Sequence, residues 1–183
     1  MDYSHIKGGA GLVKLLSTNI SSAVAAVAFN STYITSTYDS YRLVMSGIKT
    51  ASDNQDVSVR MSVDDGSNFA THLGAQIYHH MNSTSASGTE GNFAQIPVST
   101  DEEGNDALGQ VNGVLDIFNV NSTTQYKMAV GNALALNQNT TNYYKYHIGG
   151  YMLSTTAVNY IKVFTAVGGN LTAGRITLFG YAQ

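Results

Sequence analysis

The residues of this 183-residue chain with the clearest capacity for metal chemistry are its five histidines. His79 and His80 are adjacent, so on a strand they point to opposite faces and do not chelate one ion together. His72 and His80 are eight residues apart and share a face only if the strand is unbroken at Gly74. His147 lies in a tyrosine-rich segment, and no carboxylate partners stand at ligand spacing. We therefore expect structural or solvent-exposed histidines and no metal site.

The acidic residues form one cluster, DEEGND at 101–106. A calcium loop needs alternating oxygen ligands over twelve residues and a distal bidentate glutamate. Asp101, Glu103 and Asp106 do not match that spacing, so we expect a solvated loop. The DDG sequence at 64–66 is a strong tight-turn signal, because Asp and Gly both tolerate positive φ. We expect a turn there and no essential cation at either place.

The sequence also lacks the residues that nucleophilic or nucleotide chemistry requires. It contains no cysteine, which excludes thiol chemistry, disulfides and zinc–cysteine sites. It has no G-x-S-x-G elbow and no phosphate-cradling loop, and no strand precedes the glycines at positions 8, 9 and 11. We expect no catalytic residue and no cofactor, and therefore a protein that is not an enzyme.

Tyrosine is the contact-forming residue that this chain has in quantity, with twelve copies. Tyrosine anchors interfaces at low entropic cost, so the segment YYKYHIGGY predicts a sugar-stacking or protein-binding patch. Because alternate side chains of a strand point to opposite faces, half of this set is expected to pack in the core. The candidate contact residues are these tyrosines, one arginine and two apolar residues near the N-terminus: Tyr143, Tyr144, Tyr146, Tyr151, Arg60, Ile6 and Leu12.

The composition indicates an ordered, weakly charged protein. Charged residues make up 11% of the chain, against roughly 25% in an average soluble protein, while hydrophobic residues make up 43%. A net charge of −3 offers no basic footprint for nucleic acid. No segment has the apolar length of a transmembrane helix, and the N-terminus does not resemble a signal peptide. We expect no nucleic-acid or membrane partner, and synthesis in the cytoplasm of the cell that makes the protein.

The sequence predicts that short β-strands position these residues. The segment 57–63, VSVRMSV, alternates apolar residues with two serines and Arg60, and similar runs recur between turn-rich polar stretches. We predict about nine or ten strands and an all-β, antiparallel β-sandwich, of jelly-roll type, over 12–183, with a flexible or partner-ordered arm at 1–11. The segment 82–92 is predicted to be a polar loop, and Pro97 to lie at a sheet edge or strand start. The predicted core includes Leu43, Met45, Val57, Val59, Met61, Ile117, Ile161, Val163, Ile176 and Leu178.

The order of local phrases resembles a known family. STYDSYRLVMSGIKTASDNQDVSVRMSVDDGSNF and the closing IKVFTAVGGNLTAGRITLFGYAQ are similar to the small β-sandwich structural proteins of tailed bacteriophages, especially those of marine and freshwater bacteria. The residues that match the motif positions of this family include Tyr38, Tyr41, Asp53, Asp65, Gly66, Ser67, Gly169, Asn170, Gly174, Leu178, Phe179 and Gly180. The sequence departs from the family in DDGSNF, which has one glycine, and in LFGYA, where tyrosine is commoner. The resemblance implies a virion component without a catalytic site.

The expected function is therefore that of a capsid decoration or cement protein. Such a subunit binds the outer surface of a phage capsid through the major capsid protein, and stabilises the shell by mass action. The polar set of 57–63 is expected to be an exposed face suited to a subunit interface. We expect a homotrimer located on the virion surface, because trimers suit the three-fold positions of an icosahedral shell. The alternative function is a tail-fibre or receptor-binding module that recognises a host-surface glycan.

Overall fold

The computed structural model describes residues 11–80, 86–91, 94–99, 108–136 and 143–182. Every regular element in these segments is a β-strand, which confirms the all-β prediction. The strands are β1 (Leu12–Ile20), β2 (Ala26–Phe29), β3 (Tyr41–Thr50), β4 (Val57–Ser62), β5 (His72–His80), β6 (Ala86–Gly91), β7 (Ile96–Pro97), β8 (Val111–Phe118), β9 (Lys127–Leu136), β10 (Tyr143–Met152), β11 (Tyr160–Thr165) and β12 (Leu171–Tyr181).

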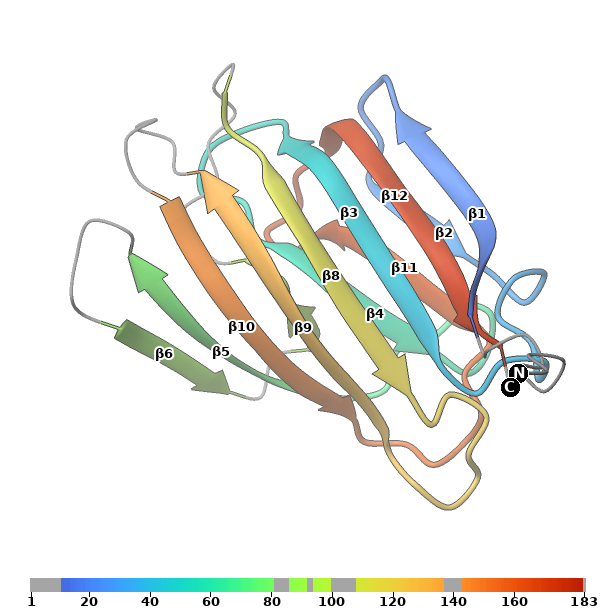
Figure 1. Ribbon diagram of the computed structural model, residues 1–183. Coiled ribbons are helices and arrows are strands. Elements are labelled where there is room, and N and C mark those ends of the chain that lie inside the picture. Colours follow the sequence, from blue (N-terminus) through green and yellow to red (C-terminus); the bar gives the residue numbers. More distant parts are fainter. Residues whose placement is uncertain (1–10, 81–85, 92–93, 100–107, 137–142, 183) are drawn as a thin grey trace, which may run out of the picture.

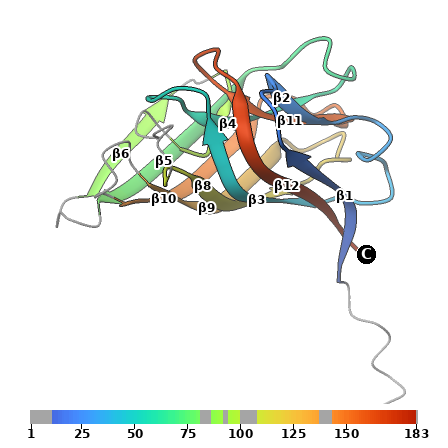
Figure 2. The ribbon, with the colours of Figure 1, turned by 90° about the horizontal axis from the view of Figure 1, so that it is seen from above.

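The strands form two antiparallel sheets packed face to face, so the predicted β-sandwich is confirmed. The larger sheet has eight strands in the order β1-β12-β3-β8-β9-β10-β5-β6, and the smaller has four in the order β2-β11-β4-β7. Figure 1 views the larger sheet from its outer side, with β2, β11 and β4 behind it. Figure 2 shows these strands stacked on one part of the larger sheet, while β5 and β6 extend away to the side. The larger sheet therefore has one face that the smaller sheet does not cover.

The core lies between the two sheets. Leu178, on β12, pairs with Leu16 of β1 on one side and with Leu43 of β3 on the other, and Leu43 pairs in turn with Leu115 of β8. This row of leucines crosses four strands on the inner face of the larger sheet. The facing strands β4 and β11 contribute β-branched residues and Met61. All ten predicted core residues are buried, which confirms the register expected from the sequence.

Some strand predictions were wrong or incomplete. The segment 82–92 was expected to be a polar loop, but 86–91 forms the edge strand β6 and pairs with β5. Backbone hydrogen bonds alone can hold a strand in a hairpin, so a strand need not carry an apolar pattern. The described strands number twelve, more than the nine or ten predicted. The acidic segment 101–106 lies outside the described residues.

Pro97 lies where the sequence predicts it. It belongs to β7, the edge strand of the smaller sheet, where a missing N–H removes no ladder bond from an inner strand. The short strand β7 packs against Gly74 of β5 and Gly150 of β10, which are register partners. A Cβ at Gly74 would stand 2.6 Å from the Pro97 ring. The glycine pair thus lets β7 cover the part of the larger sheet that extends beyond the other small-sheet strands.

The predicted start of the sandwich at residue 12 coincides with the first residue of β1. Gly11 accepts a hydrogen bond from the backbone N–H of Ala182 at 2.9 Å, which ties this point of the chain to the end of β12. Residues 1–10, which hold most of the predicted arm and Ile6, lie outside the described residues. The predicted turn at 64–66 is present, with φ of 58° at Asp65 and 87° at Gly66.

Candidate interaction surfaces

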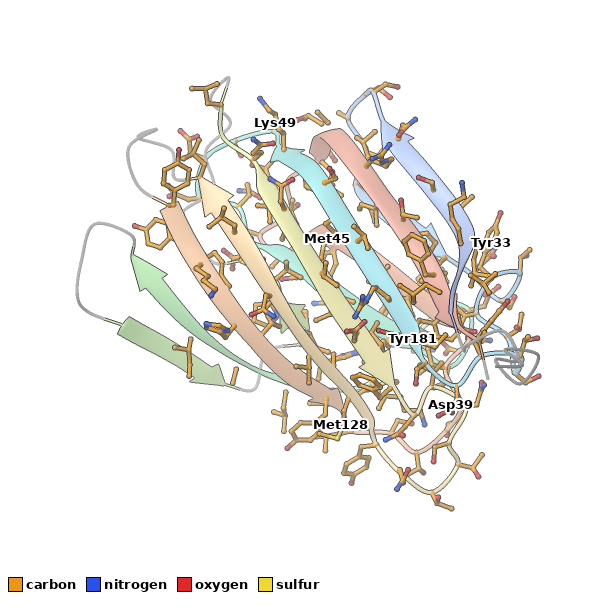
Figure 3. The ribbon with its side chains drawn as sticks, viewed as in Figure 1. Tyr33, Asp39, Met45, Lys49, Met128 and Tyr181 are labelled. Carbon is orange, nitrogen blue, oxygen red and sulfur yellow. The ribbon has the colours of Figure 1, made fainter. Side chains whose placement is uncertain are left out.

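The uncovered outer face of the eight-stranded sheet, here called the broad face, carries an unusual number of large apolar side chains. Val130 is 54% exposed, Ile77 52% and Met128 51%. Monomeric soluble proteins rarely expose large contiguous apolar patches, and those that do commonly use them as contact surfaces. Figure 3 looks onto this face and shows Met128 near its lower end. The exposed large apolar residues of its strands β5, β8, β9 and β10 are Ile77, Phe118, Met128, Val130, Leu134 and Tyr143.

Strand β9 accounts for much of this exposure because its small residues, not its large ones, face the core. Ala129, Gly131, Ala133 and Ala135 point inward, while Met128, Val130 and Leu134 point outward. The place that a side chain at Gly131 would take is already filled by Leu115 and the backbone of Val114.

Lys127 holds β9 in this register. Its side chain is buried, and its Nζ donates hydrogen bonds to the carbonyls of Ser122 at 2.6 Å and Thr155 at 2.8 Å. A buried ammonium needs such acceptors to offset the loss of its hydration. With the lysine turned inward, every second residue of β9 faces inward as well, and the large apolar residues are placed on the broad face.

The end of the broad face near Met128 is rich in aromatic side chains. Met128 pairs with Phe118 on one neighbouring strand and with Tyr151 on the other. The Tyr151 ring stacks on Tyr126, with the ring centroids 6.1 Å apart and the planes inclined by 19°. Methionine and aromatic residues are enriched at the centres of protein interfaces, and this end of the broad face has both.

One pair of opposite charges on this surface is neutralised within the protein. Arg42 donates from Nε and Nη2 to the two carboxylate oxygens of Asp116 at 2.6 and 2.7 Å, and Tyr181 donates to Asp116 Oδ1 at 2.6 Å. Burial raises the pKa of Asp116, but hydrogen bonds from Arg42 and then Tyr181 outweigh it, so the pKa lies below its ordinary value. Figure 3 places Tyr181 at the lower right of the face. A bidentate pair of this kind contributes little net charge to the surface.

The broad face is also hollowed beside β8 and β9. An open depression of about 560 Å³ is lined on its outer side by Val44, Asn112, Val114, Asn132, Leu134 and Lys145. A second depression of about 310 Å³ adjoins it at Asn132 and lies over Ile77, Val130 and Gly149. These hollows present apolar side chains, a few side-chain amides and one ammonium group to a partner. The centre of a protein interface has a similar composition, mostly apolar with a few polar groups.

The structure separates the predicted tyrosine patch into two sets. Tyr143 and Tyr151 lie on the broad face, the first exposed and the second half-buried. Tyr144 and Tyr146 face the core and are fully buried, as the alternation of a strand requires. Both buried tyrosines are therefore removed from the candidate contact residues. Leu12 is exposed at the start of β1, at the far edge of the same sheet.

The expected exposure of the polar set of 57–63 was wrong. Ser58 and Ser62 are fully buried, and Arg60 is half-buried on the outer side of the four-stranded sheet. The chain after β4 folds back over this side, which places the ring centroid of Phe69 5.8 Å from the guanidinium carbon of Arg60. The Ser62 hydroxyl accepts the backbone N–H of Gly66 and so belongs to the turn rather than to a surface.

The histidines do not form a metal site in the part of the chain that is described. Within those residues no three His, Asp or Glu side chains are placed to hold an ion. His72 is fully buried and its Nε2 accepts the backbone N–H of Met61 at 3.0 Å, which requires the neutral ring with its proton on Nδ1. His147 lies exposed on the broad face. Of the side chains of His79 and His80, nothing is described.

The buried His72 predicts a loss of stability in mild acid. Burial, with a smaller contribution from the charge of Arg60, lowers the pKa of His72 to about 4 in the folded protein. The unfolded chain binds a proton near pH 6.5, so it binds more protons than the folded state between pH 6.5 and 4. The free energy of unfolding should therefore fall by about 3 kcal/mol as the pH drops through this window. Urea denaturation at half-unit pH steps measures it.

The matched control for this prediction is His147→Gln, which removes an exposed histidine and should keep the slope of the wild-type protein. His72→Gln should flatten the slope between pH 6.5 and 4, whatever its effect on stability at neutral pH. A wild-type protein with constant stability over this window would contradict the neutral, buried state of His72.

Comparisons with known proteins give no relative on which function can be based. No protein-family model, no curated protein and no solved structure matches this chain.

Among the described residues there is no helix with the length and apolar character that crossing a membrane requires.

Proposed function

We propose that this protein is a structural subunit of a phage virion, a capsid decoration or cement protein that binds the capsid through the broad face. The observation that carries the proposal is the exposure of large apolar side chains on a sheet face whose Arg42–Asp116 pair is internally neutralised. Such a face binds by burial of apolar area, which salt does not screen. A subunit that binds only the assembled shell stabilises it by mass action and needs no chemistry.

The size of the broad face suits this role. Five strands, β3, β8, β9, β10 and β5, lie side by side at the usual spacing of about 4.8 Å, and about nine residues of each span about 30 Å. The product is roughly 700 Å², close to the roughly 800 Å² per partner of a stable protein interface. One face of one subunit therefore offers enough area for specific attachment.

The strand order supports the jelly-roll part of the proposal. When the hairpins β5-β6 and β9-β10 are set aside, the sheets read β1-β12-β3-β8 and β2-β11-β4-β7. Two four-stranded sheets interleaved in this way have the pairing of two Greek keys, an arrangement used by viral capsid domains and lectins. The two extra hairpins then enlarge one sheet only, and it is their strands that carry most of the broad face.

A charge in the middle of the broad face should abolish attachment. Val130→Asp places a carboxylate where an exposed valine would be buried by the partner, and the expected rise in the Kd for shells is at least about 30-fold. Binding of purified protein to shells stripped of it, followed by co-sedimentation, measures this. Val167→Asp is the matched control, because Val167 is 64% exposed after β11 and away from the broad face. Equal occupancy by both variants would contradict attachment through this face.

The copy number in purified virions tests the role itself. A decoration protein should be present in hundreds of copies per particle by quantitative mass spectrometry, while a tail-fibre or receptor-binding module would be present in a handful. Absence from virions would overturn the proposal. The homotrimer and its location on the capsid surface stay predictions that light scattering and electron microscopy of decorated shells test.

A further inference from the structure

We infer that the outer side of the four-stranded sheet holds a binding site for an organic carboxylate, built on Arg60 and Lys162. This side is here called the narrow face; it lies on the opposite side of the sandwich from the broad face. The inference does not depend on the proposed function, because it concerns different residues and a different class of ligand.

The two cations are held together by the register of the sheet. Arg60 on β4 and Lys162 on β11 are direct cross-strand partners. Like charges placed directly opposite each other destabilise a sheet. Burial lowers the pKa of Arg60 and of Lys162, and the neighbouring Arg60 lowers that of Lys162 further. The pair is thus a local concentration of positive charge in a chain with a net charge of −3.

Aromatic rings support the pair from the side. The Lys162 Nζ lies 4.2 Å from the ring centroid of Phe69 and 4.8 Å from that of Phe164. The Arg60 guanidinium carbon lies 4.8 Å from the Phe164 centroid and 5.8 Å from that of Phe69. Cation–π contacts of this kind offset part of the repulsion but add no negative charge. Among the residues that the structure describes, the pair therefore still lacks a counter-ion.

No carboxylate in the described residues lies within ion-pair distance of either cation. The ion pair found among the described residues, Arg42 with Asp116, belongs to the larger sheet. The one hydrogen bond that Arg60 makes in this part of the chain runs from Nη2 to the side-chain oxygen of Gln95 at 2.9 Å. The Arg60 Nε is buried and has no acceptor among the described residues. The remaining guanidinium hydrogens and the ammonium of Lys162 are donors for which the fitting ligand is an acceptor with negative charge.

The surroundings select among anions. Arginine presents a planar fork that matches a carboxylate, and lysine adds a point charge beside it. Phe69, which is half-buried at the margin of the site, offers an apolar surface that favours a carboxylate attached to an organic body over a strongly hydrated inorganic ion. The ligand class is therefore an organic carboxylate, either a sugar acid or another organic acid.

Titration of the full-length protein with four probes tests the assignment: glucuronate, benzoate, sulfate and glucose. Glucuronate and benzoate should shift the backbone amide signals of Arg60, Lys162 and Phe69, with a Kd of about 1 mM, in the range for ligands of this size. The tighter of the two identifies the kind of organic body that the site prefers. Glucose should give no shift, and sulfate should bind at least about 10-fold more weakly. Sulfate binding as tight as glucuronate would overturn the choice of a carboxylate.

Lys162→Gln should weaken glucuronate binding at least about 10-fold, and raising NaCl should weaken binding to the wild-type protein. The matched control is Lys145→Gln, which removes a lysine from the broad face and should bind like the wild type. Without ligand, Lys162→Gln should melt no lower than the wild type, because a like-charge contact is relieved; this readout shows that the variant is folded. Unchanged affinity in a folded Lys162→Gln protein would overturn the site.

Discussion

Leu178→Ala is expected to lower the free energy of unfolding by about 2–5 kcal/mol, in the upper part of that range. Leu178 is fully buried and lies in the middle of the leucine row, between Leu16 and Leu43. Its neighbours are held on two other strands, β1 and β3, and cannot close the cavity without shifting the sheet. Urea denaturation monitored by tyrosine fluorescence measures the loss.

The matched control for this truncation is Leu153→Ala. Leu153 is 41% exposed at the end of β10, so the same change of side chain should cost well below 1 kcal/mol. If Leu178→Ala melts like the wild type, the inward register of β12 is wrong, and with it the core described above.

Gly174→Ala is expected to destabilise the protein by about 4 kcal/mol, because two separate costs combine there. Gly174 has a φ of 111°, which a residue with a Cβ rarely adopts. A Cβ at this position would also stand 2.6 Å from the carbonyl oxygen of Gly47 on β3. Thermal unfolding of the purified variant measures the effect.

The conformation at Gly174 belongs to a pair of irregularities on neighbouring strands. The register of β12 with β3 shifts around Gly174, and the register of β3 with β8 shifts around Gly47, whose φ is 62°. The backbone N–H of Gly47 donates to the side-chain oxygen of Asn112 at 2.8 Å in place of a regular ladder bond. Both bulges require left-handed backbone, which explains physically why a glycine stands at 174 in the closing GNLTAG phrase.

Gly149→Ala is the matched control, since a Cβ at Gly149 would meet nothing within 4 Å. Alanine there should leave stability unchanged or raise it slightly, because glycine in a strand loses more conformational freedom on folding. Equal effects at Gly149 and Gly174 would show that the glycines act through the unfolded chain alone and not through the bulges.

Local pattern was enough to predict most of the fold. Alternation in 57–63 placed Val57, Val59 and Met61 in the core, because a strand surface has a period of two whatever the rest of the molecule does. The turn at 64–66 and the edge position of Pro97 follow from backbone chemistry that is equally local. Absence of cysteine and the low charge, read from composition, likewise needed no tertiary structure.

The two candidate surfaces were decided by contacts between segments distant in sequence. KMAVGNALAL alternates, but alternation does not tell which set is inward. The outward placement of Met128, Val130 and Leu134 depends on the carbonyls of Ser122 and Thr155 around Lys127, and on Leu115 filling the space beside Gly131. The contrast between large and small residues in this run was the one local signal that could have indicated an unusual strand.

The narrow face, too, could not be predicted from the sequence alone. Local pattern predicted that Ser58, Arg60 and Ser62 form an exposed polar face. In the folded protein Phe69 packs beside Arg60, and Ser58 and Ser62 are fully buried. The pairing of Arg60 with Lys162 joins positions about a hundred residues apart and exists only in the register of β4 with β11. Sequence alone determined that strands and a core would form, because burial and backbone geometry act over a few residues. Tertiary structure decided which surfaces were left uncovered and which charges met there, because both depend on what the rest of the chain covers.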